Sequence, residues 1–126
     1  MIVDPIADML IRIKNAYMAH RDVVEIPKSR LKHELALLLA KLNYVDKVNS
    51  DSTYIKISLF YRQGKPATSG VKRLSKPGLR RYAGVDEIKK MHFGLGHLVI
   101  STPQGLKTHK EAIKAKMGGE ILFQIW

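Results

Sequence analysis

The chain has 126 residues, no cysteine, and 22 Lys and Arg against 11 Asp and Glu, a formal net charge of +11. This length is enough for one ordinary core or two small subdomains, and the lack of thiols excludes disulfide scaffolds, thiolate zinc sites and cysteine nucleophiles. So large an excess of positive charge predicts a polyanionic partner, nucleic acid before others, and because residues from Gly64 onward carry +8 of it, we expect the second half to dominate the contacts.

The hydropathy pattern predicts a soluble protein without a membrane partner. The longest apolar stretch, residues 35–42, is interrupted by Lys41 and is far shorter than the ~20 residues that span a bilayer. Asp4 and Asp8 lie where a secretory or transit peptide would be free of acidic residues.

The first predicted elements are a helix and an edge strand. Asp4-Pro5 is typical of a helix start, because aspartate caps free amides and proline at the first helical position loses no hydrogen bond. Apolar residues then recur at helical spacing as far as Tyr17. Residues 23–27 end at a proline, which favours a short strand at the edge of a sheet.

A second helix and a hairpin complete an amino-terminal α-β-α-β-β unit over residues 1–63. Ser29 is expected to cap the helix, and Asn43 to end it. Residues 44–49 and 53–62 predict two paired strands across a turn at 50–52.

Residues 64–70 contain two glycines, a proline and two hydroxyl residues, the composition of a linker. Beyond it, residues 71–126 predict a mainly β unit with one short helix. Thr108-His109-Lys110-Glu111 has the pattern of a capping box, so the helix should run from there to Met117. Strands are expected at 71–75, 79–82, 97–102 and 120–126, the first two joined by a turn at Lys76-Pro77-Gly78. The predicted fold class is therefore α+β with two small subdomains.

Motifs that would indicate a metal, cofactor or catalytic site are incomplete. The five histidines show no ligand spacing, and no nucleophile elbow is present. Gly64-Lys65 is similar to the end of a phosphate-binding loop, but Leu59 stands where that motif needs its first glycine and Pro66 where it needs a hydroxyl. We expect no metal, no cofactor, no small-molecule substrate and no catalysis; the alternative is a small basic enzyme acting on a polyanionic substrate.

Basic residues coincide with predicted turns. Lys28 and Lys32 flank a helix start, and a second group surrounds the Pro-Gly turn: Lys72, Arg73, Lys76, Arg80 and Arg81. Because the overall charge is uncompensated, phosphate contacts are favoured over a merely solvated basic face.

The predicted strand at 97–102 ends in two hydroxyl residues, a proline and, at Gly105, a glycine. Ser101 and Thr102 can donate and accept hydrogen bonds, so they suit base edges, phosphates and ribose 2′-hydroxyls. Gly105 lets a backbone approach closely. An ordinary strand-to-helix connection is the other interpretation, and spacing alone slightly favours it.

Read together, DPIADMLIRIKNAY, KPGLRRY, and STPQG followed by GGE resemble ribosomal protein S8 of the small subunit, in its bacterial or organellar form. The resemblance runs nearly end to end, in order and spacing. It implies a two-domain α+β protein of a bacterial cytoplasmic or an organellar ribosome. Such a protein binds the central domain of the small-subunit ribosomal RNA, lies beside neighbouring small-subunit ribosomal proteins, supports assembly and catalyses nothing.

The resemblance also implies which residues bind rRNA. In the second unit the hydroxyl-rich loop corresponds to Ser101, Thr102 and Gly105, and the glycine-glutamate segment to Gly119 and Glu120. The basic-aromatic segment after the Pro-Gly turn corresponds to Arg80 and Tyr82. The charge pattern adds Lys76 in that turn. In the first unit, five residues match positions that approach the RNA backbone: Asn15, Lys28, Ser29, Lys32 and Lys56.

Two segments depart from the family's usual pattern. Pro103 replaces a serine and so removes a hydroxyl and an amide hydrogen. His109-Lys110 replaces Asp-Arg, which adds positive charge at a helix start, where the macrodipole disfavours it. Glu120 is an unusual acidic residue for an RNA site; it is expected either to accept from a base amino group or to orient the loop.

Overall fold

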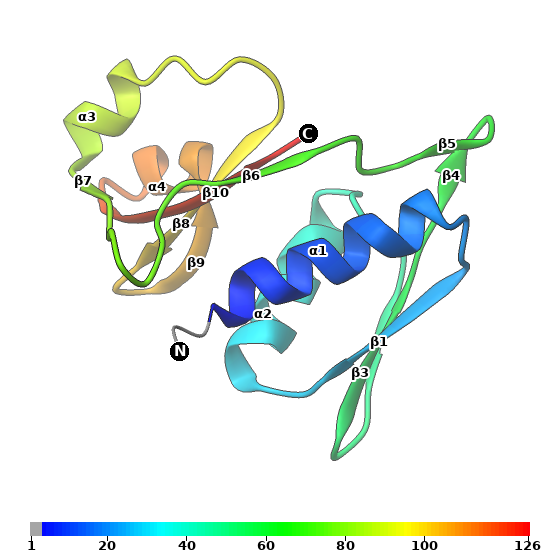
Figure 1. Ribbon diagram of the computed structural model, residues 1–126. Coiled ribbons are helices and arrows are strands. Elements are labelled where there is room, and N and C mark those ends of the chain that lie inside the picture. The colour runs from blue at the N-terminus through cyan, green and yellow to red at the C-terminus, as the bar shows by residue number, and fades with distance from the viewer. Residues whose placement is uncertain (1–3) are drawn as a thin grey trace. The chain divides into compact units, whose positions relative to one another are not determined.

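A computed structural model describes residues 4–126, and the chain divides into two compact units, Pro5–Ser69 and Asp4 with Gly70–Trp126. Both contain helices and strands (Figure 1), which confirms the predicted α+β class. Within residues 4–126, no helix combines the length and the apolar character needed to cross a membrane.

The amino-terminal unit contains a three-stranded antiparallel sheet and a small separate hairpin. β3 is the central strand of the sheet, whose order is β1-β3-β2, so β1 is an edge strand as predicted. Ser29 caps the second helix by accepting a hydrogen bond from the Lys32 amide at 3.2 Å, also as predicted. In chain order the elements are α1 (Pro5–Met18), β1 (Val23–Pro27), α2 (Arg30–Lys41), β2 (Val48–Ser50), β3 (Tyr54–Ser58), β4 (Tyr61–Arg62) and β5 (Lys65–Pro66).

The core of this unit lies between its two helices and one face of its sheet. Successive residues of a strand point to opposite faces, so Ile55 and Ile57 are fully buried while Lys56 between them is exposed. The helices contribute buried side chains at helical spacing, among them Met9, Ile13 and Tyr17 from α1 and Leu35 and Leu39 from α2.

The predicted strand at 53–62 is wrong in extent. β3 ends at Ser58, and the Leu59 amide donates instead to the carbonyl of Asp22 at 2.8 Å. The chain then forms a second hairpin, in which β4, at the end of the predicted strand, pairs with β5, which lies in the segment predicted as a linker. Its two-residue turn has positive φ at Gln63 (52°) and Gly64 (78°), the geometry that matches the twist of hairpin strands.

The carboxyl-terminal unit is a five-stranded antiparallel sheet with two short helices. β10 pairs with β6, β7 and β8, and β9 pairs with β8. A buried cluster joins the helices to the sheet: Ile88, Leu98, Ile100, Ala112 and Ile121. The elements are β6 (Val71–Arg73), β7 (Tyr82–Ala83), α3 (Val85–Lys90), β8 (His97–Thr102), β9 (Gly105–Thr108), α4 (His109–Lys114) and β10 (Gly119–Ile125).

Two of these elements, α3 and β9, are absent from the sequence-based prediction. The expected strand-to-helix connection after Thr102 is in fact a β-hairpin, in which Thr102 pairs with Gly105. α4 begins at the predicted capping box, with reciprocal bonds between Thr108 and Glu111 at 3.1 and 3.2 Å. It ends at Lys114 instead of Met117, and the left-handed residue that follows is Lys116 (φ 56°).

The expected extra positive charge at the start of α4 is only partly present. The Nδ1 atom of His109 accepts the Leu98 amide at 3.3 Å, and its ring lies edge-on to Phe93 with 4.6 Å between centroids. Burial, followed by the nearby His97 and Lys110, lowers the pKa of His109 below 6.5. The neutral ring is therefore favoured at pH 7, and Lys110 alone supplies the added charge.

Tyr17 generates a stability prediction for the amino-terminal unit. Its buried hydroxyl donates to the Tyr44 carbonyl at 2.7 Å and accepts the Phe60 amide at 3.4 Å. In Tyr17→Phe the Phe60 amide loses this acceptor, whereas the Tyr44 carbonyl keeps the Thr68 hydroxyl at 2.8 Å. We expect the free energy of unfolding, measured by urea denaturation, to fall by about 1–2 kcal/mol.

The control is Tyr54→Phe, at a ring that is 46% exposed. This variant should remain within about 0.5 kcal/mol of the wild type. Equal losses in the two variants would contradict the role assigned to the Tyr17 hydroxyl.

Candidate nucleic-acid interface

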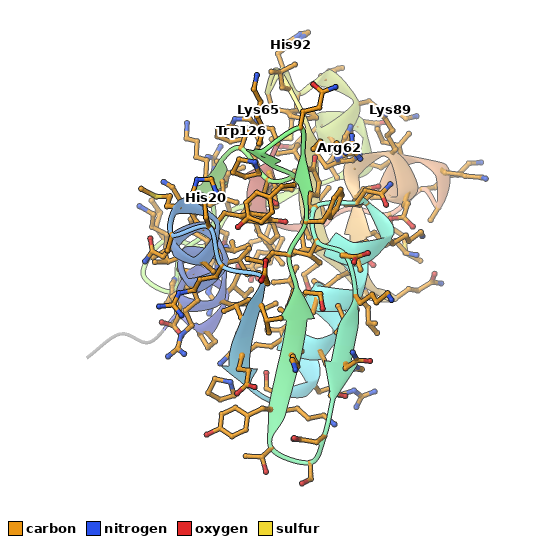
Figure 2. The ribbon with its side chains drawn as sticks, turned by 90° about the vertical axis from the view of Figure 1, so that its right-hand side faces the viewer. His20, Arg62, Lys65, Lys89, His92 and Trp126 are labelled. Carbon is orange, nitrogen blue, oxygen red and sulfur yellow. The ribbon has the colours of Figure 1, made fainter. Side chains whose placement is uncertain are left out.

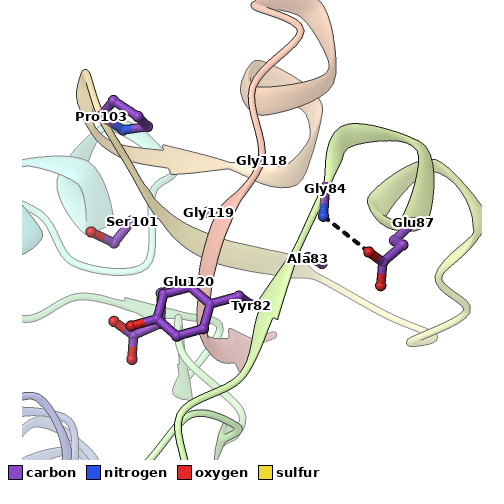
Figure 3. Close-up of a pocket in the computed structure, with 9 residues that line it drawn as sticks. All are labelled: Tyr82, Ala83, Gly84, Glu87, Ser101, Pro103, Gly118, Gly119 and Glu120. Atoms are coloured by element: carbon purple, nitrogen blue, oxygen red, sulfur yellow. Dashed lines mark hydrogen bonds between the residues drawn. The ribbon is translucent and has the colours of Figure 1, made fainter.

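Three of the predicted site residues lie in one row across the carboxyl-terminal sheet. Tyr82 of β7 pairs with Glu120 of β10, and Glu120 pairs on its other side with Ser101 of β8. Directly opposed residues of an antiparallel pair project from the same face of a sheet. The three side chains are therefore neighbours, with Glu120 in the middle (Figure 3); we call them the Tyr82–Glu120–Ser101 row.

The row borders an open pocket of about 600 Å³, and the Tyr82 ring at its edge is 68% exposed. A Cβ atom on Gly119 would lie 2.0 Å from the Ser101 carbonyl oxygen, and one on Gly118 would lie 2.3 Å from the Ala83 carbonyl oxygen. Only glycine permits so close an approach of β10 to both neighbouring strands. The remaining lining residues are Ala83, Gly84, Glu87 and Pro103.

Glu120 ties the basic turn to the sheet. Its Oε2 atom accepts hydrogen bonds from the hydroxyl of Ser75 and from Nη1 of Arg80, the latter at 3.0 Å. Ser75 is fully buried, and its Oγ atom also accepts the Arg81 amide at 3.0 Å. This geometry favours an orienting role for Glu120, because one carboxylate holds both the turn and the Arg80 side chain.

The turn itself presents cationic side chains. Lys76 and Leu79 exchange backbone hydrogen bonds of 3.1 and 2.9 Å across Pro77-Gly78. Lys76 is exposed, and half of the Arg80 side-chain surface remains accessible despite its bond to Glu120. The hydrogen bond from Arg80 to Glu120 raises the pKa of the guanidinium, so its positive charge is secure.

The two adjacent hydroxyls at the end of β8 have different roles. Thr102 is buried, with 8% of its surface exposed. Its Oγ1 atom donates to the Gly105 carbonyl at 2.8 Å and accepts the Gln104 amide at 3.1 Å. Ser101 is half-buried and faces the pocket, and within residues 4–126 its hydroxyl makes no hydrogen bond. Ser101 is therefore available to a ligand, whereas Thr102 stabilises the turn.

The proline in this turn fits its position. Its fixed φ suits the first central residue of a β-turn, and Gly105 after the turn has φ 104°, which favours glycine. The missing serine hydroxyl at Pro103 therefore leaves the geometry of the hairpin intact.

The five predicted residues of the amino-terminal unit lie at separate places. Lys28 donates from Nζ to the Asp51 carbonyl at 3.0 Å, and Ser29 and Lys32 belong to the cap of α2. Lys56 lies on the exposed face of β3, paired with Glu25 and Asn49. Asn15 is exposed near the end of α1, where it lines a groove with Arg12, Ala16, Ala19, Arg21, Val23, Val24 and Glu25.

Ser75 is the site residue that the sequence does not reveal. A serine between a strand and a Pro-Gly turn is an ordinary turn residue, and its partners Arg81 and Glu120 lie 6 and 45 positions away. As for other chemistry, residues 4–126 contain no group of three or more His, Asp or Glu side chains placed to hold a metal ion.

The Glu120 anchor predicts a pH-dependent stability. Burial alone raises the pKa of its carboxyl, but the hydrogen bonds from Ser75 and Arg80 outweigh burial and hold the pKa below 4.5. A carboxyl with a lowered folded-state pKa contributes stability above its unfolded pKa, and this contribution is lost as the pH falls through the folded pKa. The Tm of the wild type should therefore exceed that of Glu120→Gln at pH 7, and the difference between the two Tm values should shrink below pH 4.5.

The difference in Tm caused by Glu120→Gln should be smaller in a Ser75→Ala background, because Ser75 donates one of the two hydrogen bonds that Glu120 accepts. A difference in Tm that stays constant from pH 7 down to strongly acidic pH would show that the ionised carboxylate is not the anchor.

Comparison with known proteins agrees with the geometry. A family model described as Ribosomal protein S8 matches residues 4–126. Proteins named small ribosomal subunit protein uS8 from Persephonella marina and Nitratidesulfovibrio vulgaris are 47% and 45% identical over 136 and 126 positions, with 100% of both chains covered in each case. One from Caldanaerobacter subterraneus is 45% identical over 130 positions, covering 99% of this chain and 98% of the relative.

These relatives are named as ribosomal proteins and not as enzymes, so the alternative of a small basic enzyme is set aside. The match includes all three segments on which the resemblance was first based. The chain belongs to the ribosomal protein S8 family of the small ribosomal subunit.

Proposed function

We propose that this protein is a structural constituent of the small ribosomal subunit, which binds the central domain of the small-subunit ribosomal RNA and supports assembly of the subunit. The observation that carries the proposal is the Tyr82–Glu120–Ser101 row, set beside an open pocket in a chain of this family. Its neighbours would be other small-subunit ribosomal proteins. The bacterial source of the relatives favours a bacterial cytoplasmic ribosome over an organellar one.

The row offers the contacts that an irregular RNA needs. The exposed ring of Tyr82 is a surface on which an unpaired base can stack. Ser101 can donate to and accept from a base edge or a ribose 2′-hydroxyl. Gly118 and Gly119 line the pocket without side chains, so an RNA group can approach the backbone there.

Cationic side chains around the row would bind phosphates. Lys76 and Arg80 lie on the turn that Glu120 anchors to β10, so their charges are presented beside the row. Phosphate contacts fix position, and base contacts supply selectivity. We therefore assign affinity and salt dependence to Lys76 and Arg80, and selectivity to Tyr82 and Ser101.

The amino-terminal unit would add backbone contacts. Lys28, Lys32, Lys56 and Asn15 offer cationic or amide donors to phosphates, while Ser29 acts through the helix it caps. In this proposal the RNA-selective subdomain begins after the 64–70 segment.

Two neighbouring hydroxyls provide a matched test. Ser101→Ala should weaken binding to a transcribed central-domain RNA by about 1–3 kcal/mol, because a desolvated RNA group loses its partner. Its thermal stability should stay within about 0.5 kcal/mol of the wild type. Thr102→Val should instead destabilise the fold by about 1–2 kcal/mol, because the Gln104 amide and the Gly105 carbonyl lose their shared partner.

Binding is measured by filter retention on the central-domain RNA and on a scrambled RNA of equal length, and stability by thermal unfolding. Unchanged affinity in Ser101→Ala would remove Ser101 from the interface. A wild-type protein that binds both RNAs equally at moderate salt would refute the proposed function.

A further inference from the structure

The β4–β5 hairpin is a surface of the amino-terminal unit that none of the residues assigned above occupies. It lies at the end of that unit remote from the β2–β3 turn (Figure 1). All four residues of its tip, Arg62-Gln63-Gly64-Lys65, are exposed. A Cβ atom on Gly64 would meet no atom within 4 Å, so the space beside the turn is open.

Two cations face each other across this hairpin. Arg62 pairs directly with Lys65, so the two side chains start from the same face. Like charges at directly opposed positions are unfavourable. Within residues 4–126, neither side chain has an ion-pair partner; the Arg62 guanidinium lies 5.5 Å from the centroid of the Phe60 ring. An anion bound at the tip would relieve this repulsion.

The hairpin is held in place through Tyr61, which projects from the face of β4 opposite to that of Arg62. Figure 2 labels Arg62 and Lys65 of the tip, and His20. The Tyr61 hydroxyl donates to the Arg21 carbonyl at 2.7 Å, and the Tyr61 ring stacks on His20 and meets Tyr17 edge-on, with centroids 5.6 and 5.4 Å apart. Because an isolated two-stranded hairpin is marginally stable in water, this packing is what fixes the tip. A backbone that is already ordered loses less freedom on binding.

The amino-terminal unit has its own excess of positive charge. Pro5–Ser69 has eleven Lys and Arg against six Asp and Glu, a net +5, and Asp4 with Gly70–Trp126 has eleven against five, a net +6. The expected concentration of charge in the second half therefore disappears when the chain is divided where the fold divides it. The tip supplies two of the uncompensated charges of the first unit.

We propose that Arg62 and Lys65 form a second phosphate-binding surface, which contacts the sugar-phosphate backbone of RNA independently of the Tyr82–Glu120–Ser101 row. The inference rests on the proposed function only in taking ribosomal RNA as the polyanion. Two cations beside Gly64, which has no side chain, suit the charge of a phosphodiester, and we assign both to the backbone of the RNA. The surface therefore adds affinity and orientation but no selectivity.

The test compares full-length Arg62→Gln/Lys65→Gln with Lys47→Gln/Lys89→Gln, a control that removes two exposed lysines and the same net charge. Both are titrated with the central-domain RNA and with the scrambled RNA between about 50 and 200 mM salt. Each phosphate contact contributes about 0.9 to the slope of log K against log salt. The slope for the hairpin variant should therefore be smaller than the wild-type slope by nearly two. The ratio of the wild-type binding constant to that of the variant should accordingly fall about tenfold between the lowest and the highest salt concentration.

The control should keep the wild-type slope, and the preference for the central-domain RNA should be unchanged in both variants. Arg62→Lys/Lys65→Arg, which conserves the charges, should restore the slope. Thermal unfolding should stay close to that of the wild type, because neither substitution touches Tyr61 and Arg62→Gln removes only an exposed contact with the Phe60 ring.

A hairpin variant with the slope of the control would overturn the inference. So would wild-type RNA binding combined with loss of the variant from assembled subunits, since the tip would then bind an acidic protein neighbour. Ser101→Ala, measured in parallel, separates the two proposals: if it alone weakens binding, the proposed function stands and the hairpin surface fails.

Discussion

The pairing register of β10 is the constraint on which the interface depends. Glu120 is opposite Tyr82 on one side and Ser101 on the other, so three residues from distant parts of the sequence become neighbours without any loop having to place them. The register is possible because Gly118 and Gly119 have no side chains. The backbone at these two positions lies so close to the neighbouring strands that a Cβ atom would clash with a carbonyl oxygen of each. A glycine pair that reads as loop-like in the sequence thus acts at the start of a central strand.

Glu120 converts this register into an arrangement of charge. A carboxylate beside an expected RNA surface would repel phosphate if it stood alone, but here it is 13% exposed and accepts from both Ser75 and Arg80. Its negative charge is paired with Arg80 and orients that side chain. The adjacent exposed positions, Lys76 and Arg81, leave the turn positive towards solvent.

Local signals in the sequence predict local structure well. The Ser29 cap, the Thr108 capping box and the strand at 97–102 depend on residues close in the chain, and all three are present. α3 and β9 span six and four residues, too short for a periodic pattern to stand out. β3 is shorter than its alternation suggests because the Leu59 amide bonds to the Asp22 carbonyl, a partner 37 residues earlier that no local pattern reveals.

The sequence supplies candidate site residues, but it does not show which of their side chains are already engaged within the protein. The family resemblance predicts that Ser101, Tyr82 and Glu120 bind rRNA, and the fold brings these three into one row. That Thr102 is occupied by its own turn, and that buried Ser75 supports Glu120, follows from contacts that residue types do not specify. The Arg62–Lys65 pair was hidden for the same reason, because a single strand over 53–62 would have placed the two cations in no particular relation.

A register-built interface limits how the chain can change in length. Side chains alternate at the start of β10, before the bulge between Ile121 and Phe123. One residue inserted next to Glu120 would shift the strand by one position and turn the shifted side chains to the opposite face. Insertions in connections outside the strands leave the row unaffected. The relative that aligns over 136 positions while covering both chains completely shows that such length differences exist in this family. We expect such insertions to be missing at the start of β10, over residues 119–121, even where the amino acids themselves are free to vary.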